Sequence, residues 1–96
     1  MRRIVWTEEA VDNLEAIVSY ISAFNPDAAR KLATRLIDVA DSLAEFAERG
    51  RDAGDGRREM TIVRPYILRY RVTADTVFIL RIRHGARADD EGDGGD

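Results

Sequence analysis

Residues 66–83 have the sequence YILRYRVTADTVFILRIR, and apolar and polar side chains alternate on both sides of its central TAD. This alternation, with a short polar interruption, predicts two antiparallel strands joined by a tight turn. If the alternation is continuous, one face carries Leu68, Tyr70, Val72, Phe78, Leu80 and Ile82. The other face then carries Arg69, Arg71, Val77, Ile79, Arg81 and Arg83. We therefore expect a strand hairpin with one apolar face and one face rich in arginine.

Two amphipathic helices are predicted upstream of this hairpin. Thr7 is placed to cap the first helix, and Asn25 with Pro26 is placed to begin the second. The first apolar stripe contains Ala10, Val11, Leu14, Ile17, Val18, Ile21 and Phe24. The second stripe contains Ala29, Leu32, Leu36, Val39, Leu43 and Phe46, and Gly50 is the expected C-terminal stop. The short link between the stripes favours an antiparallel helical hairpin that covers the apolar face of the sheet.

Two further strands complete the predicted domain. RRIVW at residues 2–6 and REMTIV at 58–63 have the β-branched or alternating composition of strands, and GRDAGDGR at 50–57 is expected to form a flexible loop. The order β-α-α-β-β-β predicts an α+β fold, with a helical hairpin on one face of a small antiparallel-hairpin sheet. We expect a single domain over residues 1–87 and a disordered acidic tail over residues 88–96.

Composition excludes several kinds of site. The chain of 96 residues has no cysteine and a single histidine, His84, so disulfides, thiolate zinc sites and multi-histidine metal sites cannot form. No nucleotide-binding glycine motif is present, and we expect neither a metal nor a cofactor. The N-terminal segment lacks the apolar core of a signal peptide, and no stretch has the length of a membrane span. A cytoplasmic protein is therefore expected.

The net charge of −3 conceals a strong asymmetry along the chain. Residues 1–48 carry a net charge of −4, residues 49–87 carry +6, and residues 88–96 carry −5. Every basic residue between 49 and 87 is arginine, which suits bidentate contact with phosphate or carboxylate. An arginine-rich strand face could bind nucleic acid or an acidic protein segment, and the sequence does not separate these two ligands.

His84 is the obvious candidate for acid–base chemistry, because its unperturbed pKa lies nearest neutrality. The segment RIRHGAR contains no serine or cysteine that this imidazole could activate. A histidine that hydrogen-bonds locally or contacts a partner at the end of a strand is therefore the favoured interpretation.

Taken together, these segments resemble the RelE/ParE toxin superfamily of bacterial type II toxin–antitoxin systems. The resemblance covers residues 2–87 and rests on VWTEEAVDNLEAIVSYI, NPDAARKLATRLIDVADSLAEF, ERGR, RRE, YILRYRV and VFILRIRHGAR in this order. The ending HGAR is most similar to the ParE branch, whose members are also described as plasmid stabilisation proteins. The resemblance implies a toxin that is neutralised by a cognate, ParD-like antitoxin in a hetero-oligomer.

The superfamily has two activities, and the residues favour one of them. RelE-type members cleave mRNA on the ribosome, and ParE-type members are taken to inhibit DNA gyrase, and so replication, without a chemical step. Ile67 stands where the RelE pattern has a catalytic arginine, and no tyrosine follows Arg87. An isoleucine cannot contact a phosphate through hydrogen bonds or transfer a proton, so a gyrase inhibitor without catalytic residues is the leading hypothesis.

The resemblance also suggests which residues bind. The candidate target-binding residues are Arg58, Arg81, Arg83, His84 and Arg87. The candidate antitoxin-binding residues are Leu14 and Leu36 on the helices and Arg69 and Arg71 on the sheet. Two alternatives stay open. One is a ribosome-dependent mRNA endonuclease of the RelE/YoeB type that uses His84 with nearby arginines, and the other is an inactive remnant that only binds antitoxin.

Overall fold

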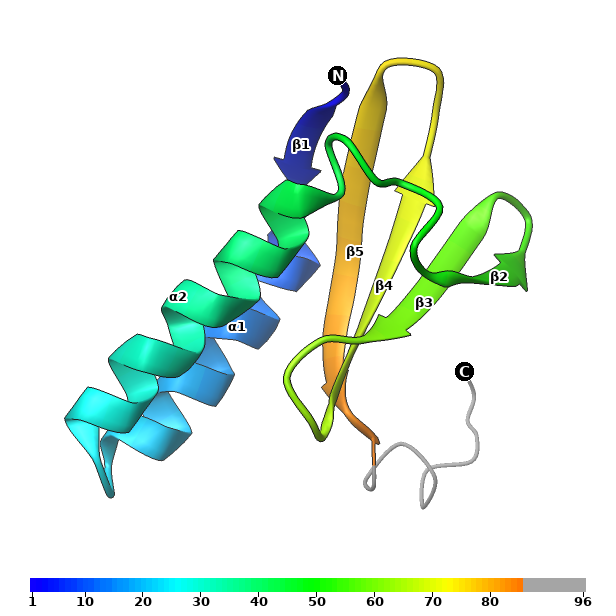
Figure 1. Cartoon of the computed structure of the whole chain (residues 1–96). Helices are drawn as coiled ribbons and strands as arrows, with labels where there is room; N and C mark the ends of the chain where they lie inside the picture. The colour runs from blue at the N-terminus through cyan, green and yellow to red at the C-terminus, as the bar shows by residue number, and fades with distance from the viewer. Residues whose placement is uncertain (86–96) are drawn as a thin grey trace.

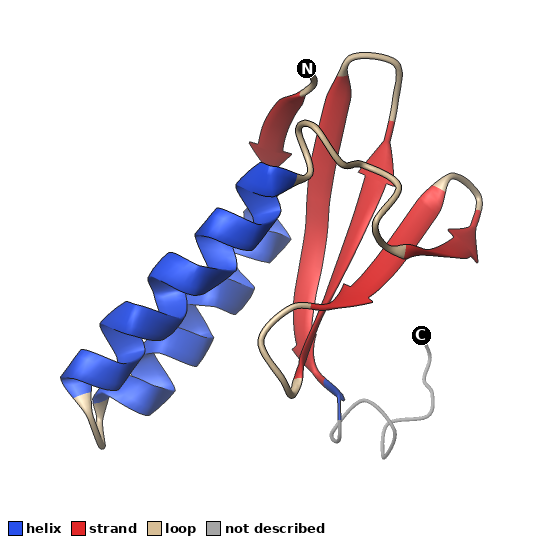
Figure 2. Cartoon of the chain, in the orientation of Figure 1, coloured by secondary structure: helices blue, strands red, loops and turns tan. Residues whose placement is uncertain are grey.

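The computed structural model describes residues 1–85, which form two helices and a five-stranded sheet (Figure 1). The elements are β1 (Arg3–Trp6), α1 (Glu8–Ser22), α2 (Pro26–Ser42), β2 (Arg51–Gly54), β3 (Arg57–Thr61), β4 (Tyr66–Val72) and β5 (Thr76–His84). The strand order is β1-β5-β4-β3-β2, with β1 parallel to β5 and every other neighbouring pair antiparallel. Both helices lie on one side of the sheet (Figure 2), so the α+β architecture and the single-faced helical cover are confirmed.

The helices begin where the sequence predicts. Thr7 Oγ1 accepts a hydrogen bond from Ala10 N at 3.1 Å, and Asn25 Oδ1 accepts one from Ala28 N at 3.1 Å. Pro26 occupies the first turn of α2, where its missing N–H has no intrahelical partner to lose. Within residues 1–85, neither helix combines the length and apolar character needed to cross a bilayer.

The predicted end of the second helix is wrong. α2 ends at Ser42 rather than near Gly50, and residues 43–50 form turns. Leu43 still reaches the core, but Phe46 is 57% exposed. Phe24, assigned to the first apolar stripe, lies beyond the end of α1, is 75% exposed and contacts the ring of Tyr20. Phe24 and Phe46 both lie beyond the ends of their helices, so the 3.6-residue helical period no longer predicts whether their side chains face the sheet.

The expected loop at residues 50–57 contains an additional edge strand. β2 pairs with β3 through a tight turn in which Gly54, Asp55 and Gly56 all have positive φ angles, of 89°, 55° and 74°. Asp52 Oδ1 accepts a hydrogen bond from Gly54 N at 2.8 Å and stabilises this turn. The sequence prediction missed β2 because four residues rich in glycine and charge carry almost no strand propensity of their own.

A β-bulge in β5 changes which side chains face the core. Arg69 pairs with Arg81, but the next residue, Tyr70, pairs with Ile79, so Leu80 is an extra residue on β5. Val77 and Ile79 are therefore fully buried, and Phe78 lies on the arginine side opposite Arg71. The predicted faces of residues 77–79 are wrong for this reason, because uninterrupted alternation cannot anticipate an inserted residue.

Two side chains from α1 and its cap stabilise the backbone around this bulge. The Thr7 hydroxyl lies 2.9 Å from the carbonyl oxygen of Ile79 and 3.1 Å from that of Leu80. Asn13 Oδ1 accepts a hydrogen bond from Ile82 N at 3.0 Å. β1 pairs with β5 only as far as Ile79, so Asn13 takes the place of a strand partner for the second half of β5.

Tyr70 connects β4 to the segment after α2. Its hydroxyl donates to Ala47 O at 2.7 Å and accepts from Gly50 N at 2.8 Å, in a fully buried position. Burial raises the pKa of Tyr70 above its ordinary value of 10.0, so the hydroxyl remains protonated and able to donate. A Cβ atom on residue 50 would lie 2.7 Å from this hydroxyl, which explains why glycine is needed there.

We expect Tyr70→Phe to lower the free energy of unfolding by about 1–2 kcal/mol, because it leaves a buried carbonyl and a buried N–H without partners. Urea denaturation followed by circular dichroism measures the change. Tyr20→Phe is the matched control, since Tyr20 is 64% exposed, and its effect should stay within about 0.5 kcal/mol. Equal effects of the two substitutions would contradict a structural role for the buried hydroxyl.

Candidate functional site

The face of the sheet opposite the helices is lined by arginine side chains. Strand register places them in cross-strand rows, with Arg51, Glu59, Arg69 and Arg81 in one row. A second row contains Arg57, Arg71 and Phe78, and a third contains Thr61, Ile67 and Arg83. We define the arginine face as Arg51, Arg57, Arg69, Arg71, Arg81 and Arg83. The hairpin pattern predicted four of these residues, whereas Arg51 and Arg57 fall in the segment 50–57, which was expected to be a loop.

Glu59 is the acidic centre of the arginine face. Its side chain is 5% exposed and accepts hydrogen bonds from Arg69 Nε at 2.8 Å and also from Arg69 Nη2. Arg51 Nη2 lies 3.3 Å from one carboxylate oxygen, and Arg83 Nη2 lies 3.3 Å from the other. Three guanidinium groups therefore share one buried carboxylate. Glu59 was not among the predicted site residues, although an acid within an arginine-rich strand segment is a sequence signal for such an ion cluster.

The arginines determine the protonation state of Glu59. Burial alone would raise the pKa of this carboxyl, but the hydrogen bonds and positive charges of Arg69 and Arg83 outweigh burial. The pKa of Glu59 therefore lies below its ordinary value of 4.5, and the group is ionised at neutral pH.

This lowered pKa makes the stability of the domain depend on pH. Because the folded-state pKa of Glu59 lies below the unfolded value of 4.5, its contribution is complete above pH 4.5 and is lost as the pH falls through the folded-state pKa. We expect the urea midpoint of the wild type to fall more steeply below pH 4.5 than that of Glu59→Gln, which has no proton to take up there. Parallel acid limbs for the two proteins would show that Glu59 does not contribute in this way.

Arg81 differs from its neighbours on the arginine face. Within residues 1–85 it forms no ion pair, and its Nε is buried without a hydrogen-bond partner. Arg83 is bound to Glu59 through Nη2, although its own Nε is also unpartnered. Arg71 donates to the backbone oxygen of Asp55 at 2.7 Å. The charge of Arg81 is therefore the one most available to an incoming anionic group.

The remaining predicted target-binding residues do not join the arginine face. His84 pairs with Tyr66 and contacts its ring edge-on, with centroids 5.5 Å apart, on the same side as the buried residue Ile82. Arg58 pairs with Tyr70 on that side as well, and its Nη1 donates to Gly50 O at 2.7 Å. Arg87 lies outside the described residues. The sheet thus separates His84 and Arg58 from Arg81 and Arg83.

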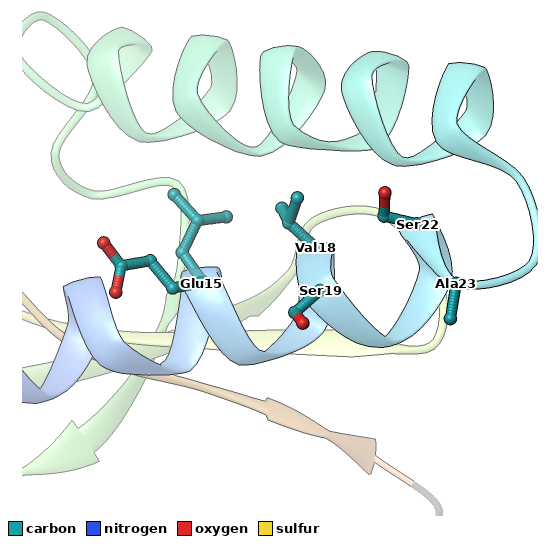
Figure 3. A pocket seen from close by; sticks show the side chains of 6 residues that line it. Glu15, Val18, Ser19, Ser22 and Ala23 are labelled. Carbon is teal, nitrogen blue, oxygen red and sulfur yellow. The ribbon is translucent and has the colours of Figure 1, made fainter.

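The helices carry the second group of predicted contacts. A shallow hollow follows α1 (Figure 3) and is lined by Leu14, Glu15, Val18, Ser19, Ser22 and Ala23. Leu14 is therefore accessible at this surface, but Leu36 is fully buried and cannot contact a partner in this fold. Its neighbour Ile37 is 39% exposed. Tyr20 and Phe24 form an exposed aromatic pair at the end of α1.

Comparison with known families identifies the chain. Residues 4–89 match the family model described as the ParE toxin of the type II toxin–antitoxin system parDE. The chain belongs to this family. As a ParE family toxin, it is the toxin component of a type II toxin–antitoxin system.

The chain is similar to bacterial proteins named as toxins or putative toxins and to solved toxin structures. Toxin RelE2 of Caulobacter vibrioides is 51% identical over 87 residues, which span 91% of this chain and 99% of that protein. Putative toxin Y4kP of Sinorhizobium fredii is 38% identical, over 86% of this chain and 88% of that protein. The chromosomal ParDE system of P. aeruginosa contains a chain with 27% identity and a TM-score of 0.76, covering 88% of this chain and 96% of that one. The E. coli DinJ–YafQ complex, at 18% identity and a TM-score of 0.51, shows the fold alone, over 91% of this chain and 97% of that one.

Proposed function

We propose that this ParE family toxin inhibits DNA gyrase by binding it through the arginine face, with Arg81 as the principal contact and Arg83 beside it. The observation that carries the proposal is the separation of His84 from these arginines by the sheet. The toxin then acts by occupying a protein surface rather than by catalysing a reaction. Arg87 follows the same strand in sequence and belongs to the proposed contact.

The chemistry of RNA cleavage supports this assignment. A nuclease needs a proton-transfer group and a phosphate-stabilising cation that reach the same reacting atoms. The imidazole of His84 and the guanidinium of Arg81 lie on opposite faces of β5. Ile67 occupies the arginine-face position opposite Arg83 and has no polar group. Glu59 could not serve as the proton-transfer group in place of His84, because its carboxylate is 5% exposed and is enclosed by arginines.

A cognate antitoxin of the ParD-like kind is the proposed neutralising partner. The hollow beside Leu14 on α1 offers an apolar surface for a helix, and the exposed Tyr20–Phe24 pair lies on the same helix and its C-terminal link. Acidic side chains of the antitoxin would contact Arg71, whereas Arg69 is already held by Glu59. Both proposed partners place the protein in the cytoplasm.

A second candidate function is ribosome-dependent mRNA cleavage. It is favoured by the 51% identity to a protein named Toxin RelE2. Under this alternative, His84 would have to catalyse cleavage on the face of the sheet opposite Arg81, without any contribution from the Arg81 guanidinium.

Two assays of the same protein separate the candidates. The chain is made by cell-free synthesis and added to plasmid supercoiling by purified gyrase, and separately to purified ribosomes translating a defined mRNA. The proposal predicts loss of supercoiling and linearised plasmid in the first assay, with intact mRNA in the second. Cut mRNA with normal supercoiling would overturn the proposal in favour of the nuclease. Activity in neither assay would favour the antitoxin-binding remnant.

A further inference from the structure

The arginine face has more positive charge than its own carboxylates neutralise. Within residues 1–85, Glu59 pairs with three of its arginines and Asp55 pairs with Arg57 at 3.6 Å. Six guanidinium groups against these two carboxylates leave a surplus of four positive charges. Two of these charges belong to Arg81 and Arg71, which form no ion pair in this part of the chain, and the other two belong to the Glu59 cluster. Such a surface favours an anionic ligand.

The chain itself contains a matching anionic segment. Residues 88–96, ADDEGDGGD, carry five acidic side chains and no basic one. The ParE family match ends at residue 89. The alignment with Toxin RelE2 covers 99% of that protein but 91% of this chain. Most of the acidic segment therefore lies beyond the part that defines the family, so the common toxin fold does not account for it.

We propose that the acidic segment of residues 89–96 binds the arginine face of its own chain at Arg81 and Arg71. The segment thereby competes with any other anionic ligand of that face. The contact itself does not depend on the identity of the target, but its effect on toxicity rests on the proposed gyrase contact.

Chain dimensions permit this contact. The described chain ends at Gly85, whose N–H donates to Pro65 O at 2.8 Å at the end of β5. Arg81 precedes Gly85 by four residues, which is about 13 Å along a strand. Asp89 follows Gly85 by four residues and can reach back over about 14 Å when extended. The segment also contains Gly92, Gly94 and Gly95, which allow the backbone to turn without steric cost.

Covalent connection favours this occupant over a free acidic peptide. A short flexible link gives an effective concentration on the order of millimolar, which is enough to populate a contact made of weak surface ion pairs. The same ion pairs are sensitive to salt, because the Debye length falls from about 30 Å at about 0.01 M to about 3 Å at about 1 M. The contact should therefore be occupied at low ionic strength and open at high ionic strength.

The first test compares the full chain with a full-length variant whose five tail acids are replaced by Asn or Gln (D89N, D90N, E91Q, D93N, D96N). Both proteins are made by cell-free synthesis with ¹⁵N-arginine, and the Nε–H resonances are recorded at low and high salt. We expect the Arg81 and Arg71 resonances to differ between the proteins at low salt and to converge at high salt. Arg35, exposed on α2, is the internal control and should not differ.

The second test uses a synthetic peptide, ADDEGDGGD, added to the variant with the neutral tail. We expect Arg81→Gln to weaken peptide binding about fivefold, since an exposed ion pair contributes up to about 1 kcal/mol, and Arg35→Gln to leave binding unchanged. Three results would overturn the proposal: identical Arg81 resonances at low salt, equal responses of Arg81 and Arg35, or binding unaffected by Arg81→Gln. None of these readouts involves gyrase, so failure here and failure of the proposed target are distinguishable.

Discussion

Glu59→Gln should lower the free energy of unfolding by about 3 kcal/mol, because removal of one member of a buried ion cluster leaves the others uncompensated. Glu59 is the shared partner of Arg51, Arg69 and Arg83, and its side chain is 5% exposed. The substitution preserves shape and leaves three cations close together without a countercharge. For a domain whose total stability is about 5–15 kcal/mol, the loss is large, and the melting temperature should fall by roughly 15 °C.

Urea denaturation at pH 7 measures this loss, and a second substitution tests its cause. If repulsion among the arginines is responsible, Arg69→Met in the Glu59→Gln background should recover part of the stability, with a coupling energy above about 1 kcal/mol. Asp55→Asn is the matched control, since it removes a carboxylate that is 85% exposed, and it should change stability by less than about 0.5 kcal/mol. A Glu59→Gln protein as stable as the wild type would contradict the claim that Glu59 stabilises the fold by neutralising the arginines around it.

Local sequence signals were sufficient for much of this fold. The caps at Thr7 and Asn25 and the alternation in residues 66–72 each act within a few residues, so they can be recognised without knowledge of tertiary contacts. β2 and the bulge at Leu80 could not be recognised in this way. β2 forms by pairing with the edge of β3, and the bulge is stabilised by Thr7 and Asn13 from a distant part of the chain.

The candidate site was predicted less completely than the fold. Arginines at alternating positions indicated the face, but their individual availability depends on cross-strand partners. Arg69 and Arg81 are equivalent in the sequence pattern, and only the register shows that Glu59 holds Arg69 while Arg81 has no acidic partner in the described chain. His84 and Arg83 are adjacent in sequence, yet strand geometry directs them to opposite faces. A run such as RIRH therefore cannot be treated as one site.

Arg81→Gln should abolish growth arrest by the toxin while leaving its stability within about 0.5 kcal/mol of the wild type. The substitution breaks no ion pair within residues 1–85, so we expect it to lower the affinity for the target and not the stability of the fold. A hydrogen bond from a charged group contributes about 1.5–3 kcal/mol, so binding to the target should weaken roughly 10- to 100-fold. Induction without antitoxin, with pulse labelling of DNA and protein synthesis, measures the arrest. Continued arrest by a folded Arg81→Gln protein would show that the arginine face is not the target contact.

His84→Gln provides the opposite expectation for the same measurement. The imidazole packs against Tyr66 on the helix side of the sheet, and its Nδ1 has no hydrogen-bond partner within the described residues. Glutamine keeps a polar side chain of similar length but cannot act as a general acid or base near neutral pH.

If the toxin acts by surface contact, His84→Gln should arrest growth as the wild type does, with DNA synthesis failing before protein synthesis. If the toxin is a nuclease that depends on His84, the same variant should be inactive while Arg81→Gln retains partial activity. The two substitutions therefore give opposite rankings under the two mechanisms, and a single induction experiment on both variants distinguishes contact from catalysis.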